Sequence, residues 1–155
     1  MSTEPRPVIL PPGGGKGYEW SADHTFVKVG AADTGGAYAL LEDNLKPGFR
    51  LGLHLHRTHA ETFYILTGPV WFWLAGAWHG AEAGACIHIP PGTPHAVELP
   101  KGGTGRMLMI YQPSGFDAML AEMAGMTEAE FADPAAMARM NDRYDIVPLG
   151  DAPPR

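Results

Sequence analysis

Four side chains that are able to bind a metal ion occur in two short segments of the sequence. His54 and His56 are separated by one residue near the end of a segment with alternating large side chains, and Glu61 opens the next apolar run after a four-residue break. If both runs are strands, their two-residue period places the histidines on one face, and a tight turn over 57–60 brings Glu61 beside them. His95, in the second segment, is a fourth candidate ligand. Imidazole nitrogens and a carboxylate that converge in this way are typical of a site for a divalent metal ion.

The spacing of these residues matches two signature motifs. The first is a glycine, five residues, His-x-His, four residues, a glutamate, six residues and a glycine, and it is satisfied by Gly48, His54, His56, Glu61 and Gly68. The second is a glycine, five residues, Pro-x-Gly, two residues, a histidine, three residues and an asparagine, and it is satisfied by Gly84, Pro90, Gly92 and His95. On these motifs the chain resembles the cupin family. Leu99 stands where the pattern has asparagine, but that asparagine is not a metal ligand in the family, so the departure leaves the predicted ligands intact.

The sequence and the resemblance together predict an all-β fold. The 20 glycines and 15 prolines favour many short strands joined by tight turns, as in a small barrel or jelly roll. The cupin resemblance covers roughly residues 20–112 and implies the double-stranded β-helix (jelly-roll) barrel of that family. We therefore expect an extended, proline- and glycine-rich arm over 1–17 and a cupin β-barrel over 18–112.

After the barrel, the pattern changes to that of short helices. Apolar residues over 116–124 recur at helical spacing, Thr127 to Glu130 forms a capping box, and Asp133 precedes a proline at the first position of a third helix. We expect a helical tail over 113–146 that packs on the barrel, followed by a loose C-terminus over 147–155. The run Val70–Leu74 is apolar on both faces, so its outer face needs cover from the C-terminal helices or a neighbouring subunit. This strand, the arm and the habit of the family favour a homodimer.

Composition excludes several classes of function. With 155 residues the chain fits one domain, and its formal net charge of -6 argues against nucleic-acid binding driven by phosphate neutralisation. No segment is apolar over a length that would cross a membrane, and the start lacks the apolar core of a signal peptide, so we expect a cytoplasmic protein without membrane partners. Cys86 is the single cysteine, which rules out an intramolecular disulfide, and its place beside isoleucines predicts a buried strand residue.

The predicted donor set indicates an open, catalytic type of metal site. Three histidines and one glutamate contain no thiolate, which argues against a structural zinc site, and on a six-coordinate ion they leave two positions for a substrate or dioxygen. Fe, Mn, Ni, Co, Cu and Zn are all compatible with these ligands, so the identity of the one divalent transition metal stays open. Phe63 and Ile65 share the strand face of Glu61 and, with Val97, are predicted to line an apolar substrate pocket. His59 is predicted to be a turn or surface residue.

Two further segments are similar to those of small single-domain cupins described as quercetin-dioxygenase-like. They are Thr34-Gly35-Gly36, which is expected to form a hairpin turn before the first motif, and Pro113-Ser114-Gly115-Phe116, which opens the tail. This resemblance implies a metal-dependent dioxygenase that acts on a small aromatic or enol substrate able to chelate through oxygen. In such enzymes the counterpart of Glu61 ligates weakly and acts as the general base.

Two other functions stay open at the level of the sequence. The same site could serve an isomerase, epimerase or decarboxylase that does not use dioxygen, although the mostly apolar predicted lumen argues against sugar substrates. A non-catalytic cupin that binds a small molecule is the third interpretation, because this fold carries many chemistries. Substitution of Glu61 separates these classes, since an enzyme should lose turnover while a binding protein should keep its ligand.

Overall fold

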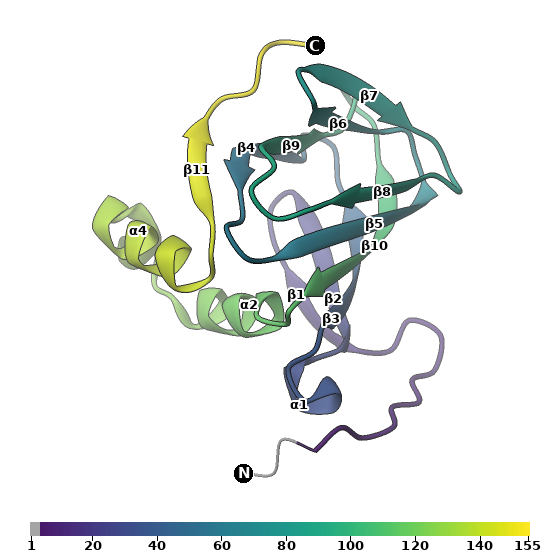
Figure 1. Ribbon diagram of the computed structural model, residues 1–155, viewed down its shortest axis with the longest axis vertical. Coiled ribbons are helices and arrows are strands. Elements are labelled where there is room, and N and C mark those ends of the chain that lie inside the picture. Colours follow the sequence, from purple (N-terminus) through teal and green to yellow (C-terminus); the bar gives the residue numbers. More distant parts are fainter. Residues whose placement is uncertain (1–3) are drawn as a thin grey trace.

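Two antiparallel sheets form the body of the molecule in the computed structural model, which describes residues 4–155 (Figure 1). Within these residues the strand orders are β1-β2-β3-β10-β5-β8 in the first sheet and β11-β4-β9-β6-β7 in the second. The strands are β1 (Lys16–Glu19), β2 (Asp23–Val29), β3 (Ala39–Leu45), β4 (Arg50–Leu55), β5 (Ala60–Thr67), β6 (Val70–Leu74), β7 (Ala77–Ala81), β8 (Cys86–Ile89), β9 (His95–Glu98), β10 (Gly105–Gln112) and β11 (Val147–Gly150). Several neighbouring strands, such as β3 and β10, come from distant parts of the chain, and the predicted all-β jelly-roll barrel is confirmed.

The central pair β5–β10 shows why these segments form strands. Inward and outward side chains alternate along both strands, as expected when one face of a sheet is buried. The register places Glu61 opposite Tyr111, and the next inward pair is Phe63 opposite Met109. Further along, the core is closed by contacts between the sheets, such as the Phe63 and Phe72 rings with centroids 5.1 Å apart.

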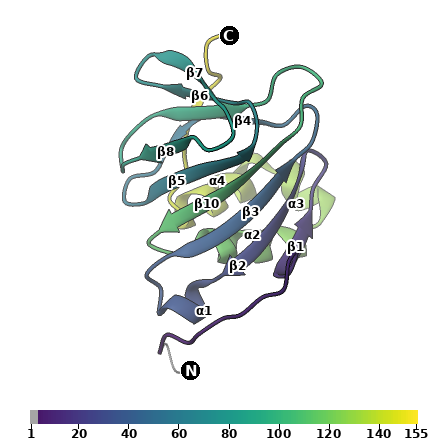
Figure 2. The same cartoon turned by 90° about the vertical axis from the view of Figure 1, so that its right-hand side faces the viewer.

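The predicted helical tail is also present. Its helices are α2 (Phe116–Gly125), α3 (Glu128–Ala132) and α4 (Pro134–Arg143), and Figure 2 shows them behind β10, β3 and β2. The capping box of α3 forms between Thr127 and Glu130, and Asp133 caps α4 by accepting a hydrogen bond from a backbone N–H. Leu120 of α2 is buried in the core of the barrel, which ties the tail to the sheets.

The last nine residues are not loose, and this corrects the prediction for 147–155. The strand β11 pairs with β4, where Pro148 lies opposite His54, and it lies beside that strand in Figure 1. Beyond it, the carbonyl of Pro153 accepts a hydrogen bond from Trp78 Nε1 at 2.9 Å, and the Arg155 guanidinium lies 4.6 Å from the Trp71 ring centroid. The open edge of β4 and the outer tryptophans of β6 and β7 supply the partners that a loose tail would lack. Cover for these tryptophans thus comes from the C-terminal segment of the same chain.

The N-terminal part also departs from the prediction in detail. Residues 1–3 of the expected arm lie outside the described residues, and Lys16 and Gly17 at its other end belong to β1. Arg6 forms an ion pair with Asp33 at 2.7 Å, so the arm contacts its own chain. The predicted hairpin at 34–36 is instead the end of a one-turn helix, α1 (Ala31–Thr34), which stops because Gly35 takes a left-handed conformation. Cys86, which was predicted to be a buried strand residue, is exposed, because it lies opposite the exposed Tyr64 on the outer face of its sheet. Among the described residues, no helix combines the length and apolar character needed to span a membrane.

Candidate metal centre

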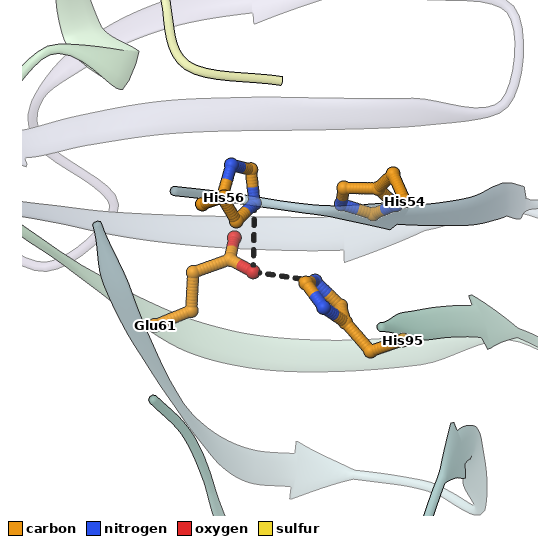
Figure 3. Close-up of side chains that lie close together, drawn as sticks. All are labelled: His54, His56, Glu61 and His95. Carbon is orange, nitrogen blue, oxygen red and sulfur yellow. Dashed lines mark ion pairs between the residues drawn. The ribbon is translucent and has the colours of Figure 1, made fainter. Parts of the chain in front are cut away.

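The four predicted ligands come together between the two sheets. His54 lies on β4, His56 directly follows it, His95 begins β9 and Glu61 lies on β5 of the opposite sheet. Their ligand atoms all lie within 4.8 Å of one another, and Figure 3 shows the side chains pointing toward one point. The local reason is the strand pairing, since β4 and β9 place His54 directly opposite His95. The structure therefore builds a cluster that is able to hold a metal ion.

Each histidine is held by a hydrogen bond from Nδ1 to a backbone carbonyl. The acceptors are the carbonyls of Gly52 for His54 at 2.8 Å, Asp145 for His56 at 2.8 Å and Thr93 for His95 at 2.9 Å. In a neutral imidazole, an Nδ1–H donor leaves Nε2 with a free lone pair. Hydrogen bonds of this kind fix the tautomer and the ring orientation of metal-binding histidines. All three rings are thus prepared to present Nε2 as a ligand atom.

The atoms that face one another across the cluster fit a bound cation. Glu61 Oε2 lies 2.7 Å from His95 Nε2 and 3.2 Å from His56 Nε2 (Figure 3). Both Glu61 Oε2 and His95 Nε2 are buried, and neither has a hydrogen-bonding partner among the described residues. Two lone pairs at such a distance repel each other unless a proton or a cation lies between them, and a buried polar atom without a partner is costly. The residues present fit a divalent transition-metal ion.

At neutral pH, most of the residues in the cluster have the protonation state that binding of a metal ion requires. Burial alone would raise the pKa of Glu61, but the adjacent His56 and His95 lower it to about 2. Burial, with the neighbouring His95, lowers the pKa of His54 to about 4. The pKa of His56 is raised, because Glu61 outweighs the effect of burial. Glu61 is therefore ionised and His54 neutral at pH 7, while a proton on His56 competes with the metal ion.

This competition predicts a pH-dependent metal affinity. Below its raised pKa, His56 carries a proton on the nitrogen that would ligate, so binding must release that proton. We expect the association constant for Co²⁺ to rise by about tenfold per pH unit from pH 6 until His56 is deprotonated. Titration of the metal-free protein with Co²⁺ at several pH values checks this, and a constant affinity between pH 6 and 8 would contradict it.

Two residues beside His56 are absent from the predicted site. The Tyr111 hydroxyl lies 2.9 Å from Nδ1 and 3.0 Å from Nε2 of His56, and burial raises its pKa above the usual range, so the phenol stays protonated. His59 lies in the turn between β4 and β5, in agreement with the prediction of a turn or surface residue, but it is half-buried and its Nδ1 lies 2.8 Å from Asp145 Oδ2. Strand parity with Met107 and Met109 is a signal that could have placed Tyr111 inside the barrel. No comparable signal exists for His59, because its partner Asp145 is far away in the sequence.

A cavity of about 740 Å³ opens beside the cluster. His54, His56 and Glu61 line it together with apolar side chains from β10, α2 and the turn before β4, which include Phe49, Met107, Met109, Phe116, Met119 and Leu120. Phe63, Ile65 and Val97, which were predicted to line the substrate pocket, are not part of this wall and are almost fully buried. Their strand parity is correct, but the part of the barrel into which they point is filled by side chains. The helical tail thus supplies part of a pocket wall that the sequence assigned to the strands alone.

Comparisons with known proteins agree with this geometry. Residues 42–111 match the family described as "Cupin domain". Residues 42–111 are therefore a cupin domain. Over 85 residues it is 29% identical to quercetin 2,3-dioxygenase of Bacillus subtilis (strain 168), a match that covers 55% of this chain and 25% of that relative.

Solved structures show the same cupin fold at low identity. KdgF from Halomonas sp. is 12% identical with a TM-score of 0.63, and the match covers 73% of this chain and 99% of that one. A predicted oxalate decarboxylase from Thermotoga maritima is 19% identical with a TM-score of 0.61, and the match covers 68% of this chain and 99% of that one. At these identities the comparisons establish the architecture and leave the reaction open.

The cupin cavity has a polar end apart from the metal ligands. Asp23, Thr25 and Asp43, from β2 and β3, also line it, and Thr25 Oγ1 lies 3.1 Å from Asp43 Oδ1 and 3.5 Å from Asp23 Oδ2. Burial, reinforced by the charge of Asp23, raises the pKa of Asp43 to about 7, and burial also raises the pKa of Asp23. The pair therefore shares a proton at neutral pH, which the prediction of a mostly apolar lumen did not include.

Proposed function

We propose that this cupin is a metal-dependent dioxygenase that acts on a small aromatic or enol substrate able to chelate through oxygen. The observation that carries the proposal is that the cluster of His54, His56, Glu61 and His95 lies beside a largely apolar cavity and that all of its members except His95 line the cavity wall. A volume of about 740 Å³ lies within the range of roughly 300–1,000 Å³ that is usual for small-molecule sites. The similarity to a quercetin 2,3-dioxygenase supports the same reaction class.

The residues of the chain have distinct roles in this proposal. His54, His56, Glu61 and His95 would hold a divalent metal ion, which would polarise substrate oxygens and lower the pKa of a substrate hydroxyl. Glu61 is the ionised carboxylate on the cavity wall and is therefore the group placed to accept that proton. Phe116 and Met119 of α2 would pack on the apolar body of the substrate and keep water away from it.

The test of the proposed function is dioxygen consumption by metal-loaded protein with a panel of flavonols, catechols and diketones. We expect substrate-dependent uptake of dioxygen, and we expect Glu61→Gln to lower turnover by at least about a hundredfold, because it removes the proton acceptor. Glu82→Gln is the matched control, since Glu82 is exposed and should leave turnover unchanged. If no substrate in the panel causes dioxygen uptake by protein with a full complement of metal, the dioxygenase proposal fails.

A reaction without dioxygen, an isomerisation or decarboxylation of a small molecule, is the second candidate. It is favoured by the acid pair Asp23 and Asp43, which adds proton-exchanging groups to the cavity at a distance from the metal ligands. Turnover that persists under strict exclusion of dioxygen would support this candidate against the first. If the protein binds a ligand but shows no turnover either with or without dioxygen, the non-catalytic interpretation is favoured. The homodimer and the cytoplasmic location stay predictions.

A further inference from the structure

The turn between α4 and β11 holds the loop that carries the first metal motif. The Asp145 carboxylate accepts hydrogen bonds from three successive backbone N–H groups, those of Arg57 at 2.9 Å, Thr58 at 2.8 Å and His59 at 3.1 Å. It also accepts from the Thr58 hydroxyl at 2.9 Å and lies 2.8 Å from His59 Nδ1. Five contacts from one short loop to one carboxylate make a rigid connection between parts of the chain more than 80 residues apart.

The same residue contacts a metal ligand through its backbone. The carbonyl of Asp145 accepts the hydrogen bond from His56 Nδ1 at 2.8 Å, which leaves Nε2 of that ring facing Glu61. Asp145 has a φ of 59°, in the left-handed region that aspartate and asparagine adopt more easily than most residues. This conformation turns the side chain toward the loop and the carbonyl toward the ring of His56.

We propose that Asp145 is a positioning residue of the metal centre, so that docking of the C-terminal tail and binding of the metal ion stabilise each other. The inference rests on the metal-binding part of the proposed function and is independent of which reaction follows. The carboxylate fixes the loop over 57–59, and the carbonyl sets the orientation and tautomer of His56. Because coupling between two equilibria is reciprocal, metal binding should in turn protect the docked tail.

An asparagine at position 145 isolates the contribution of the charge. Asparagine also tolerates the left-handed conformation, so the carbonyl is still offered to His56, but one carboxylate oxygen becomes an NH₂ group. Oδ2 accepts from the Thr58 N–H, the His59 N–H and the Thr58 hydroxyl, whereas Oδ1 accepts from the Arg57 N–H. The NH₂ group of an asparagine would replace one of these oxygens, and there it would face a hydrogen-bond donor of the loop where the carboxylate had offered an acceptor. The variant should therefore loosen the loop without removing a metal ligand.

The experiment measures the affinity of the full-length protein for Co²⁺ alone, by competition with a chelating dye and by the d–d absorption of the bound ion. We expect Asp145→Asn to weaken Co²⁺ binding by about 10- to 100-fold, as is usual when the partner of a ligating histidine is disturbed. The cobalt spectrum should also change, because loosening of the loop shifts the ring of His56 relative to the Asp145 carbonyl, and a general loss of stability would not cause this. Glu82→Gln is the matched control, since Glu82 is exposed between β7 and β8, outside this loop, and should leave both readouts unchanged.

Hydrogen exchange tests the reciprocal effect. In the wild-type protein, Co²⁺ should slow exchange of the amides at 57–59 and in β11, and Asp145→Asn should reduce this protection. Thr58→Ala removes one of the five contacts and should give a smaller loss of affinity, which serves as the test if Asp145→Asn does not fold. Wild-type affinity and spectrum in both variants would overturn the inference while leaving the dioxygenase proposal intact. Wild-type protein that binds no Co²⁺ would overturn both, whereas metal binding with the expected losses but without dioxygen uptake would overturn the dioxygenase alone.

Discussion

Removal of the metal ion is expected to lower the free energy of unfolding by about 4 kcal/mol when the free ion had been present at a thousandfold excess over its dissociation constant. The cluster of His54, His56, Glu61 and His95 joins β4, β9 and β5 across both sheets, so it exists only in the folded chain. An ion that binds the folded state alone stabilises it by mass action. For a domain of this size the loss should lower the melting temperature by roughly 8–16 °C.

The double variant His54→Ala/His56→Ala should show neither the metal nor the stabilisation. Elemental analysis of protein purified without added metal, with thermal unfolding before and after treatment with a chelator, measures both quantities. His79→Ala/His88→Ala is the matched control, because both of these histidines are exposed on strands and lie outside the cluster. The prediction is contradicted if neither the chelator nor added metal changes the melting temperature of the wild-type protein. Bound iron, manganese, nickel or cobalt would direct the next assays to dioxygen, and zinc would favour the isomerase or decarboxylase.

The ligand cluster could be predicted from the sequence because most of its geometry depends on residues that are close together in the chain. His54, His56 and Glu61 lie on two consecutive strands, so the strand period and one tight turn determine how they meet. His95 was added by the second motif and the family resemblance, which also supplied the barrel. The helix caps at Thr127 and Asp133 were predicted for the same local reason, since a cap depends on residues within one turn.

The parts that the sequence did not reveal depend on contacts between distant segments. Asp145 approaches the loop at 57–59 only because α4 and β11 fold back on β4, and nothing near Asp145 in the sequence indicates that loop. The tail over 147–155 has turn-rich composition, yet it is ordered by the open edge of β4 and by Trp71 and Trp78. Phe63, Ile65 and Val97 illustrate a second limit. Parity predicts which way a side chain points, but it cannot tell where the filled core ends and the cavity begins.

The acid pair in the cavity predicts a gain of stability from a single substitution. Asp43 is only 3% exposed, and burial with the neighbouring charge of Asp23 raises its pKa from 3.8 to about 7. Thr25 is the hydrogen-bonding partner of both carboxylates, and Lys46 and Glu19 also act on the charge of Asp23. The folded state therefore holds a proton that the unfolded state releases at lower pH. Stability from this group is fully present below about pH 4 and is lost as the pH rises through about 7.

Asp43→Asn should remove this penalty, because the amide resembles the protonated carboxyl in shape and is able to keep the contact with Thr25. The difference between 3.8 and about 7 corresponds to about 4 kcal/mol as an upper limit. Since Asp23 shares the proton with Asp43, we expect about half of that, a gain of about 2 kcal/mol at pH 8 and little change at pH 4. Urea unfolding of both proteins across this range measures the difference.

Asp151→Asn is the control for the acid pair, since this carboxylate is 90% exposed and its loss should leave the pH dependence of stability as it is in the wild type. An Asp43→Asn variant that is less stable than the wild type at pH 8 would show that the ionised carboxylate is satisfied in the folded state.

The same variant also tests whether the acid pair takes part in the reaction. If Asp23 and Asp43 exchange a proton with the substrate, turnover should fall while stability rises, as expected where a polar group is kept in an apolar cavity at the expense of stability. If turnover is unchanged and stability rises, the pair has no part in the reaction, and the dioxygenase gains support over the isomerase or decarboxylase.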